Sequence, residues 1–327
     1  MGELLDQLEA DGLADNTIIF HWADHGEGLP RYKRWPYDGG IHVPLIVRWP
    51  GQIEPGSVSD QLVSTIDLAP TVLSLCGAPR PMHLQGQPFL GPDAEPREYV
   101  FATRDRFDES YDMVRAVRDK RFKYLRNYLP TRPPLSWLPF RDRHAGSQAL
   151  WDGYAAGTLD ESQRVLFPEP RPAEELYDTE TDPHELHNLA DDPAHRQTLQ
   201  RMRRQLDQWR AEIGDMGEMD ETVMKRQWWG GDEQPTTAPV RFFVYGGGRY
   251  GQEPVGGYDV VRGPAVVHLH CPTQGASIAW RDAATEDGPW NLYTQPIRIE
   301  PGREMAVCAH AHRIGYRPSE QTTVRFF

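Results

Sequence analysis

The sequence feature that most constrains the fold is the apolar run at residues 17–23 (TIIFHWA), which stops directly before two polar residues. A continuous apolar run of this length predicts a β-strand that is buried on both faces. Residues 43–47 (VPLIV) predict a second strand of this kind, and residues 68–76 predict a helix. This alternation favours an α/β fold with a mostly parallel sheet flanked by helices.

Asp24 and His25 follow the first strand directly, and Lys33 comes soon after in a basic stretch with Arg31 and Arg34. Ligands of open α/β sheets bind beyond the carboxyl ends of the strands, so these side chains are expected to face a crevice. A hard divalent cation prefers oxygen ligands, and histidine can complete its shell. The residues alone leave two simpler interpretations open: a hydrogen-bonding Asp-His pair and a solvated basic loop.

Further along the chain, residues 129–172 are rich in proline, aromatic residues and arginine, and predict a long ordered surface loop. The clearest helix begins at Asp192 and Pro193. Its apolar positions recur every three or four residues, as a helix packed on one face requires. These positions are Leu199, Met202, Leu206, Trp209 and Ile213.

The composition changes after residue 229, where glycine, proline and threonine predict a linker over residues 230–238. Residues 239–327 then contain short alternating segments separated by glycine and proline, which predict a small all-β, immunoglobulin-like sandwich. We therefore expect an α/β domain over residues 1–229 and a β-sandwich domain over residues 239–327.

A formal net charge of −13 argues against a nucleic-acid-binding protein, because phosphate binding requires a basic field. It does not exclude a small anionic substrate, since a few local cations can dominate one pocket. No apolar run approaches the ~20 residues that span a bilayer. Three cysteines, Cys76, Cys271 and Cys308, are too few for a disulfide-dense scaffold.

Several segments follow one another in a fixed order: residues 23–26 (ADHG), Lys33, residues 37–40 (YDGG), residues 43–47 (VPLIV) and residues 175–193 (ELYDTETDPHELHNLADDP). This order resembles the sulfatase family of the alkaline-phosphatase superfamily. The last segment is the most specific of them.

The resemblance covers roughly residues 1–215 and is closest to the heparan N-sulfatase (sulfamidase) branch. It implies hydrolysis of a sulfuric ester or sulfamate of a sulfated glycan. Asp24 and His25 would bind one Ca²⁺ ion, and Lys33 would hold a sulfate oxygen as a catalytic residue. The metal and the lysine would offset the charge that develops during bond cleavage. The expected contacts with the sugar are His83, Arg104 and Arg106.

Sulfatases act through formylglycine, which is made from the Cys or Ser of a Cys/Ser-x-Pro/Ala-x-Arg motif near the amino terminus. Cys76 lies in CGAPR, where the proline stands one position away from its place in that motif, so we expect a buried structural thiol. We therefore expect a carboxy-terminal part of a sulfatase that lacks the nucleophile and hydrolyses no sulfate ester alone. The full-length family member is expected to be periplasmic or secreted.

The β-sandwich resembles the carboxy-terminal module of chitobiases and β-hexosaminidases, an accessory of carbohydrate-active enzymes. Two other functions remain open: a phosphoester or phosphonate hydrolase of the same superfamily, and a glycan-binding remnant without catalysis. The 175–193 segment disfavours the first. The sequence does not indicate an oligomeric state or a particular sugar.

Overall fold

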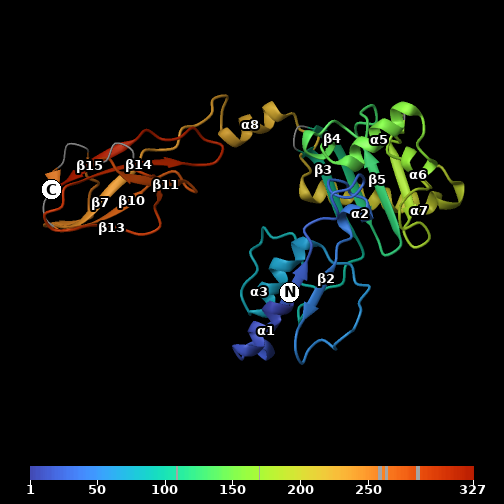
Figure 1. Ribbon diagram of the computed structural model, residues 1–327, viewed down its shortest axis with the longest axis horizontal. Helices are drawn as coiled ribbons and strands as arrows, with labels where there is room; N and C mark the ends of the chain where they lie inside the picture. The colour runs from blue at the N-terminus through green and yellow to red at the C-terminus, as the bar shows by residue number, and fades with distance from the viewer. Residues whose placement is uncertain (108–109, 169, 257–259, 262–263, 285–287) are drawn as a thin grey trace. The chain divides into compact units, whose positions relative to one another are not determined.

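The computed structural model describes the chain except for residues 108–109, 169, 257–259, 262–263 and 285–287 (Figure 1). Its contacts divide the chain into two units, Met1–Gly217 and Glu218–Phe327. The sequence prediction begins the second domain at residue 239, whereas this division also places helix α8 (Glu221–Trp229) in the second unit.

The first unit is built on a four-stranded sheet in the order β3-β4-β5-β6. The strands are β3 (Val100–Phe107), β4 (Ser110–Arg118), β5 (Phe122–Asn127) and β6 (Glu174–Asp178). Every neighbouring pair is antiparallel. Successive side chains point to opposite faces of a strand, so this sheet has two distinct faces.

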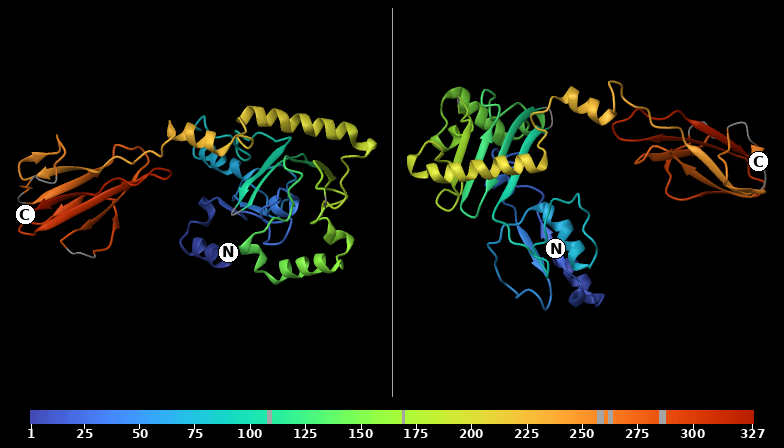
Figure 2. Two further views of the ribbon diagram at one scale, coloured as in Figure 1. Left: turned by 90° about the horizontal axis from the view of Figure 1, so that it is seen from above. Right: turned by 180° about the vertical axis from the view of Figure 1, so that it is seen from behind.

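One face of this sheet packs against helix α7 (Arg196–Ile213), the yellow helix that crosses the green strands in the right-hand view of Figure 2. The contact buries Leu199, Met202 and Leu206 of the helix, which confirms the helix predicted from its apolar spacing. A short turn, η3 (Pro193–His195), leads into the helix, and Gly214 in the left-handed conformation ends it.

The opposite face of the sheet packs against a loop rather than a helix. Trp35 and Tyr37 of this loop form an apolar cluster with residues of β4, β5 and β6, namely Val114, Ala116, Leu125 and Tyr177. Burial of each large apolar side chain stabilises such a contact by roughly 1.5–3 kcal/mol.

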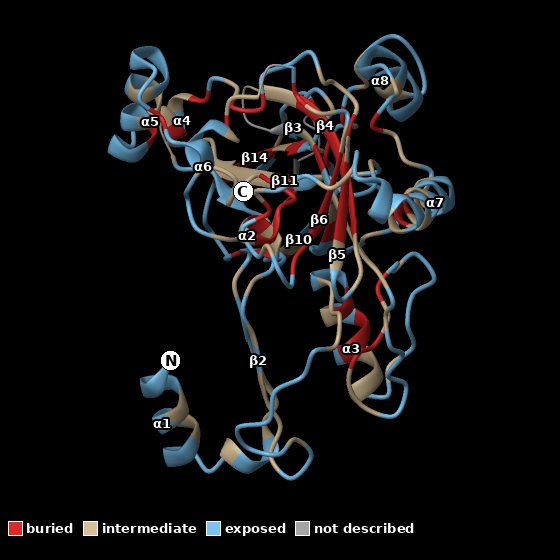
Figure 3. Cartoon of the chain, turned by 90° about the vertical axis from the view of Figure 1, so that its right-hand side faces the viewer, coloured by how far each residue is buried: buried red, intermediate tan, exposed pale blue. Residues whose placement is uncertain are grey.

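Strands β1 (Ile19–Trp22) and β2 (Leu45–Arg48) form a separate two-stranded antiparallel sheet. The expected burial on both faces is wrong, because Trp22 is 44% and Ile46 61% exposed. Each strand pairs only with the other in the described part of the chain, and helix α1 (Gly2–Ala10) has no buried residue. Figure 3 shows this contrast in burial with β4, β5 and β6.

The mixed α/β class is confirmed, but its mostly parallel sheet is not, since the described strands of the first unit all pair antiparallel. Strands β3, β4 and β5 follow one another with few residues between them, so they must pair antiparallel, because a parallel pair needs a long crossover connection. The connections from β1 to β2 and from β5 to β6 are long and would allow either direction. The remaining short elements of this region are η1 (Ala14–Asn16), α2 (Asp38–Ile41), η2 (Thr65–Asp67) and α3 (Leu68–Leu75).

The segment over residues 129–172 contains three helices, so the prediction of one long loop is wrong. They are α4 (Pro139–Asp142), α5 (Ala145–Ala156) and α6 (Glu161–Arg164). Asp160 caps α6 by accepting a hydrogen bond from the Gln163 backbone. Among the described residues, no helix is long and apolar enough to cross a membrane.

The second unit contains two sheets, in the orders β13-β10-β7-β8 and β12-β11-β14-β15-β9. Their strands are β7 (Arg241–Gly246), β8 (Arg249–Tyr250), β9 (Val260–Val261), β10 (Ala265–His270), β11 (Ser277–Asp282), β12 (Asn291–Leu292), β13 (Ile297–Ile299), β14 (Met305–His312) and β15 (Thr322–Phe326). One apolar cluster contains residues of both sheets, including Phe242, Val267, Val307 and Val324. Two sheets that share a core in this way form a sandwich.

Candidate functional site

The segment over residues 26–40, here called the lysine loop, folds back on itself through its backbone. The Gly26 amide donates a hydrogen bond to the Gly40 carbonyl (3.0 Å), and the Lys33 amide donates to the Glu27 carbonyl (2.9 Å). A Cβ atom on Gly26 would lie 1.7 Å from the Gly39 oxygen. Only glycine fits such a close backbone approach. The bond from Lys33 brings its backbone next to Glu27, which follows His25 by two positions in the sequence.

Lys33 stands between two residues with left-handed backbone conformations, Arg31 (φ 64°) and Arg34 (φ 79°). This conformation costs a residue with a side chain roughly 1–2 kcal/mol, so the surrounding contacts must hold it. The Arg31 guanidinium lies 3.9 Å from the centre of the Tyr37 ring and donates a hydrogen bond to the Glu185 carbonyl (2.7 Å). The Tyr37 ring and the Glu185 backbone, both outside the turn, thus hold Arg31 and with it the shape of the turn around Lys33.

Glu175 of β6 anchors the middle of the lysine loop. The hydroxyl groups of Tyr37 and Tyr177 each donate to its Oε2 atom at 2.7 Å, and Asn127 donates to Oε1. Burial, with the Glu175 charge next to it, raises the pKa of Tyr37 far above its usual value, so this hydroxyl remains a donor. A buried carboxylate requires such donors, and Glu175 has three.

Asp38 joins the loop to a buried ion cluster. Its backbone amide donates to Glu185 Oε2 (2.7 Å), and its carboxylate accepts from Arg118 (3.1 Å) and pairs with Lys123. Lys123 also lies 3.2 Å from Glu185 and is fully buried. Burial alone would raise the pKa of Asp38, but His42, Lys123 and Arg118 together hold it well below its usual range. Burial raises the pKa of Glu185.

These contacts explain the most specific sequence segment physically. Glu175 and Glu185 both belong to residues 175–193, and both hold the lysine loop in place. Neither residue was among the site residues predicted from the sequence, and neither were Lys123 and Arg118. The sequence signal that could have indicated Glu175 and Glu185 is the 175–193 segment, because both residues belong to it and bond to the lysine loop.

Asp24 and His25 lie together at the end of β1, with 3.4 Å between Asp24 Oδ2 and His25 Nε2. His25 Nδ1 lies 2.6 Å from the Gly26 carbonyl oxygen, which can only accept, so Nδ1 carries the proton. A metal-binding histidine has this arrangement, with one ring nitrogen donating to a backbone carbonyl and the other available to the metal. The Asp24 side chain is 84% exposed and equally available.

This donor set fits part of the coordination shell of a divalent cation. Ca²⁺ takes six to eight oxygen ligands. The described residues contain no group of three or more His, Cys, Asp and Glu side chains that could hold a metal. Asp24 and His25 can therefore supply two ligands, and the other ligands of such a site must come from elsewhere.

Lys33 lines a hollow together with Arg34, Arg104 and Arg141, here called the basic pocket. The Arg104 guanidinium stacks on Trp35 of the loop at 3.7 Å from the ring centre. The structure thus brings together Lys33 and one of the three residues predicted to contact the sugar.

Of the other two predicted sugar contacts, Arg106 is exposed and packs over Tyr111 at 4.9 Å, and His83 is exposed after helix α3. Neither residue lines the basic pocket. Their contact with a substrate stays a prediction.

The expectation of a buried thiol at Cys76 is wrong, because this residue is exposed. It lies at the carboxyl end of helix α3, as its C-cap. Unpaired carbonyl groups at that end of a helix repel anions, so the position does not suit a nucleophile that attacks a sulfate ester.

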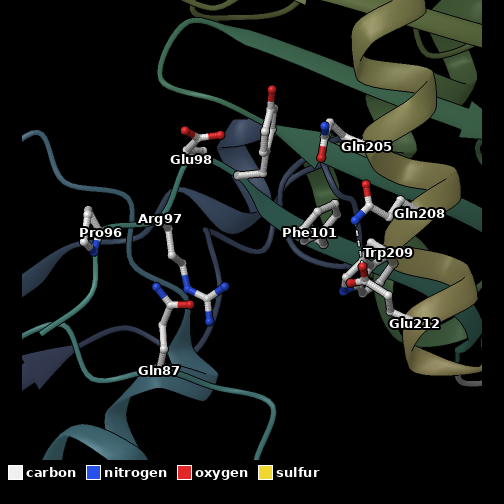
Figure 4. A pocket seen from close by; sticks show the side chains of 10 residues that line it. Gln87, Pro96, Arg97, Glu98, Phe101, Gln205, Gln208, Trp209 and Glu212 are labelled. Atoms are coloured by element: carbon white, nitrogen blue, oxygen red, sulfur yellow. Dashed lines mark hydrogen bonds between the residues drawn. The ribbon is translucent and has the colours of Figure 1, made fainter. Parts of the chain in front are cut away.

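A second hollow lies between β3 and helix α7, on the sheet face away from the lysine loop (Figure 4). Trp209 and Phe101 stack in it at 4.6 Å, and Gln208 donates to Glu212 (2.8 Å). Its arginine, Arg97, is paired with Asp67. It contains none of the predicted site residues, so the basic pocket and the Asp24-His25 pair remain the candidate site.

Comparison with known proteins gives a consistent answer. The family model described as Sulfatase matches residues 1–78. An ulvan-active sulfatase of Formosa agariphila is 37% identical over 98% of this chain and 51% of its own length. The N-sulphoglucosamine sulphohydrolase of Homo sapiens is 30% identical over 66% of this chain and 45% of its own. The chain thus spans about half the length of the curated relatives it matches.

Among solved structures, a 2-O glycosaminoglycan sulfatase is 24% identical to this chain and superposes with a TM-score of 0.49. The aligned part covers 66% of this chain and 40% of the chain of that sulfatase.

Proposed function

The chain belongs to the sulfatase family, and from this we propose that it forms part of an enzyme that removes sulfate from a sulfated glycan. The observation that supports this best is the lysine loop, which two buried acidic side chains hold in one shape. A lysine on a firmly held loop would offer positive charge at the place where negative charge develops in the transition state.

In this proposal Lys33 holds a sulfate oxygen, and Asp24 and His25 are ligands of a Ca²⁺ ion. When bound, the metal would supply positive charge that polarises the sulfuryl group. The Nδ1 hydrogen bond of His25 to the Gly26 carbonyl would leave Nε2 available to the metal. We propose that the formylglycine nucleophile comes from a segment outside these 327 residues and that the complete enzyme is exported.

The substrate proposed here is an O-sulfated polysaccharide. The ulvan-active relative matches almost the whole chain, including the second unit, whereas the human N-sulphoglucosamine sulphohydrolase matches two thirds of it. The relatives are sulfatases by name, which favours this function over a phosphoester or phosphonate hydrolase. A remnant that only binds glycans would keep the pocket but would have no use for the metal ligands.

A chimera tests the proposal. This chain replaces the aligned segment of the Formosa agariphila ulvan-active sulfatase, and ion chromatography measures the sulfate released from ulvan. We expect release that chelation of divalent cations abolishes and that Lys33→Ala lowers by about 100-fold, as for loss of one group that stabilises the transition state. The exposed Arg204→Gln is the matched control. An active chimera that is indifferent to Lys33→Ala would contradict the proposed role of the loop.

A further inference from the structure

The basic pocket holds more positive charge than one sulfate group needs. Its lining includes Lys33, Arg34, Arg104 and Arg141. One of these residues, Arg104, shares the carboxylate of Asp112 with a further arginine, Arg171. The distances to Asp112 are 3.2 Å from Arg104 and 2.8 Å from Arg171.

Arg104 is the buried side chain of the pocket with the most unused hydrogen-bonding capacity. It is 7% exposed, its Nη1 atom has only the 3.2 Å ion pair with Asp112 and no hydrogen bond, and its Nε atom has no hydrogen-bond partner among the described residues. Buried guanidinium groups normally have such partners, because an unsatisfied charged donor costs free energy. Burial, opposed by Asp112 and reinforced by Arg171, lowers the pKa of Arg104 to about 10, so it is still charged at neutral pH.

Arg141 contributes a second directed cation to the same pocket. Its Nε and Nη2 atoms bind Asp142 Oδ1 (2.9 and 2.7 Å), and Nη2 also donates to the Ser136 carbonyl (2.6 Å). These contacts fix the plane of the guanidinium while the residue lines the pocket. A planar guanidinium held in this way suits a carboxylate or sulfate oxygen better than a flexible ammonium group does.

An aromatic ring lies next to these cations. Phe140, at the start of helix α4, is 58% exposed, and its ring centre lies 5.5 Å from the Arg34 guanidinium and 6.0 Å from Lys33 Nζ. An exposed ring beside charged groups offers an apolar surface for the face of a sugar.

We propose that the basic pocket binds a second anionic group of the substrate, a sulfate or a carboxylate next to the sulfate held by Lys33. Arg104 and Arg141 recognise this second group, and Phe140 contacts the sugar that carries both. The inference rests on the proposed function and narrows it, because the preferred substrate is a sugar unit with two negative charges rather than one.

Calorimetric titration of the full chain tests this with four probes: inorganic sulfate, N-acetylglucosamine 6-sulfate, glucosamine 2-N,6-O-disulfate and a sulfated disaccharide that contains glucuronate. We expect at least one of the two doubly charged sugars to bind about tenfold more tightly than the monosulfated one, as one further charge-assisted contact implies. If only the disulfated sugar gains affinity, the second group bound in the basic pocket is a sulfate. If only the disaccharide with glucuronate gains affinity, that group is a carboxylate.

The variants separate the roles of the residues. Arg141→Gln should bring the doubly charged and singly charged sugars to within about twofold of one another, and Phe140→Ala should weaken the sugars but not inorganic sulfate. Arg141→Lys keeps the charge and should retain part of the preference, which also shows that the pocket is folded. Arg204→Gln, on the exposed side of helix α7, should change nothing.

Two results overturn the inference in distinguishable ways. If Lys33→Ala weakens every probe while all sugars bind alike and Arg141→Gln has no effect, the second anion site is absent and the proposed function stands. If Lys33→Ala also changes nothing, the sulfate site of the proposed function is absent, and the inference fails with it.

Discussion

The lysine loop and the β1–β2 pair carry the two parts of the candidate site, and they are built in opposite ways. The loop is held by Lys123 and Glu185, whose side chains are 0% and 2% exposed. The Asp24 side chain at the end of β1 is 84% exposed, and Trp22 in β1 is 44% exposed. A lysine that stabilises charge in a transition state must be held in position beforehand. Metal ligands at an exposed strand end can instead become ordered when the ion and its other ligands bind. The comparison predicts that equal chemical changes have very unequal effects in the two regions.

The largest effect is expected from Glu185→Ala. It leaves the buried Lys123 with one carboxylate fewer and removes the acceptor of the Asp38 amide. Breaking a buried ion pair from one side costs about 3–5 kcal/mol. Urea unfolding followed by tryptophan fluorescence measures this loss, with the exposed Glu180→Ala as control. A loss below about 1 kcal/mol would show that the loop does not depend on this cluster.

A matched pair of glycines gives the next effect. Gly26→Ala places a Cβ atom 1.7 Å from the Gly39 oxygen, whereas Gly28→Ala meets nothing within 4 Å. We expect Gly26→Ala to cost about 1–3 kcal/mol of stability and Gly28→Ala less than about 0.5. The same unfolding measurement checks both, and equal effects would contradict the close backbone approach in the loop.

Acid should weaken the loop region through Asp38. The folded protein holds the pKa of Asp38 well below its usual range. The stabilisation is therefore fully present above the unfolded-state pKa of about 4 and is lost as the pH falls, by about 1 kcal/mol at pH 3. Consequently, the stability difference between the wild type and Asp38→Asn should shrink from pH 7 to pH 3. The exposed Glu3→Gln should show no such trend, and a constant difference for Asp38→Asn would contradict the depressed pKa.

The smallest effect on stability belongs to the open region. Asp24→Asn should change the free energy of unfolding by less than about 0.5 kcal/mol, because the side chain is exposed. It should nevertheless remove any stabilisation that millimolar Ca²⁺ gives the wild type in a thermal melt, while Asp15→Asn, on the exposed turn before β1, retains it. A Ca²⁺-dependent shift that survives Asp24→Asn would place the metal elsewhere.

Sequence patterns predicted the parts of the fold that depend on local periodicity. Helix α7 follows from the spacing of Leu199, Met202 and Leu206, all of which are buried. The same reasoning failed for β1 and β2, because an apolar run shows which residues could be buried but not whether another element covers them. The alternation of helices and strands also does not reveal that β3 to β6 pair antiparallel, since the long connection from β5 to β6 would allow either direction.

In the candidate site, too, the residues within one local segment could be predicted, whereas those that depend on long-range contacts could not. The resemblance indicated Asp24, His25 and Lys33 as candidate site residues because they lie in one short segment, and their roles stay a prediction. The roles of Glu175 and Glu185 could not be predicted, since each bonds to the lysine loop from 138 and 147 residues away. Such pairings are decided by which faces of the sheet meet the loop, and no local pattern contains that information.

The bond between the Asp38 amide and Glu185 also sets an order of events during synthesis. A ribosome that adds about 5–20 residues per second needs roughly 7–30 s to pass from one partner to the other, because 147 residues separate them. During that interval the nascent lysine loop has neither of its acidic anchors, and its closure must wait for long-range contacts. Translational pauses between residues 40 and 185 would therefore lengthen the time in which the nascent chain is exposed to proteases and to aggregation.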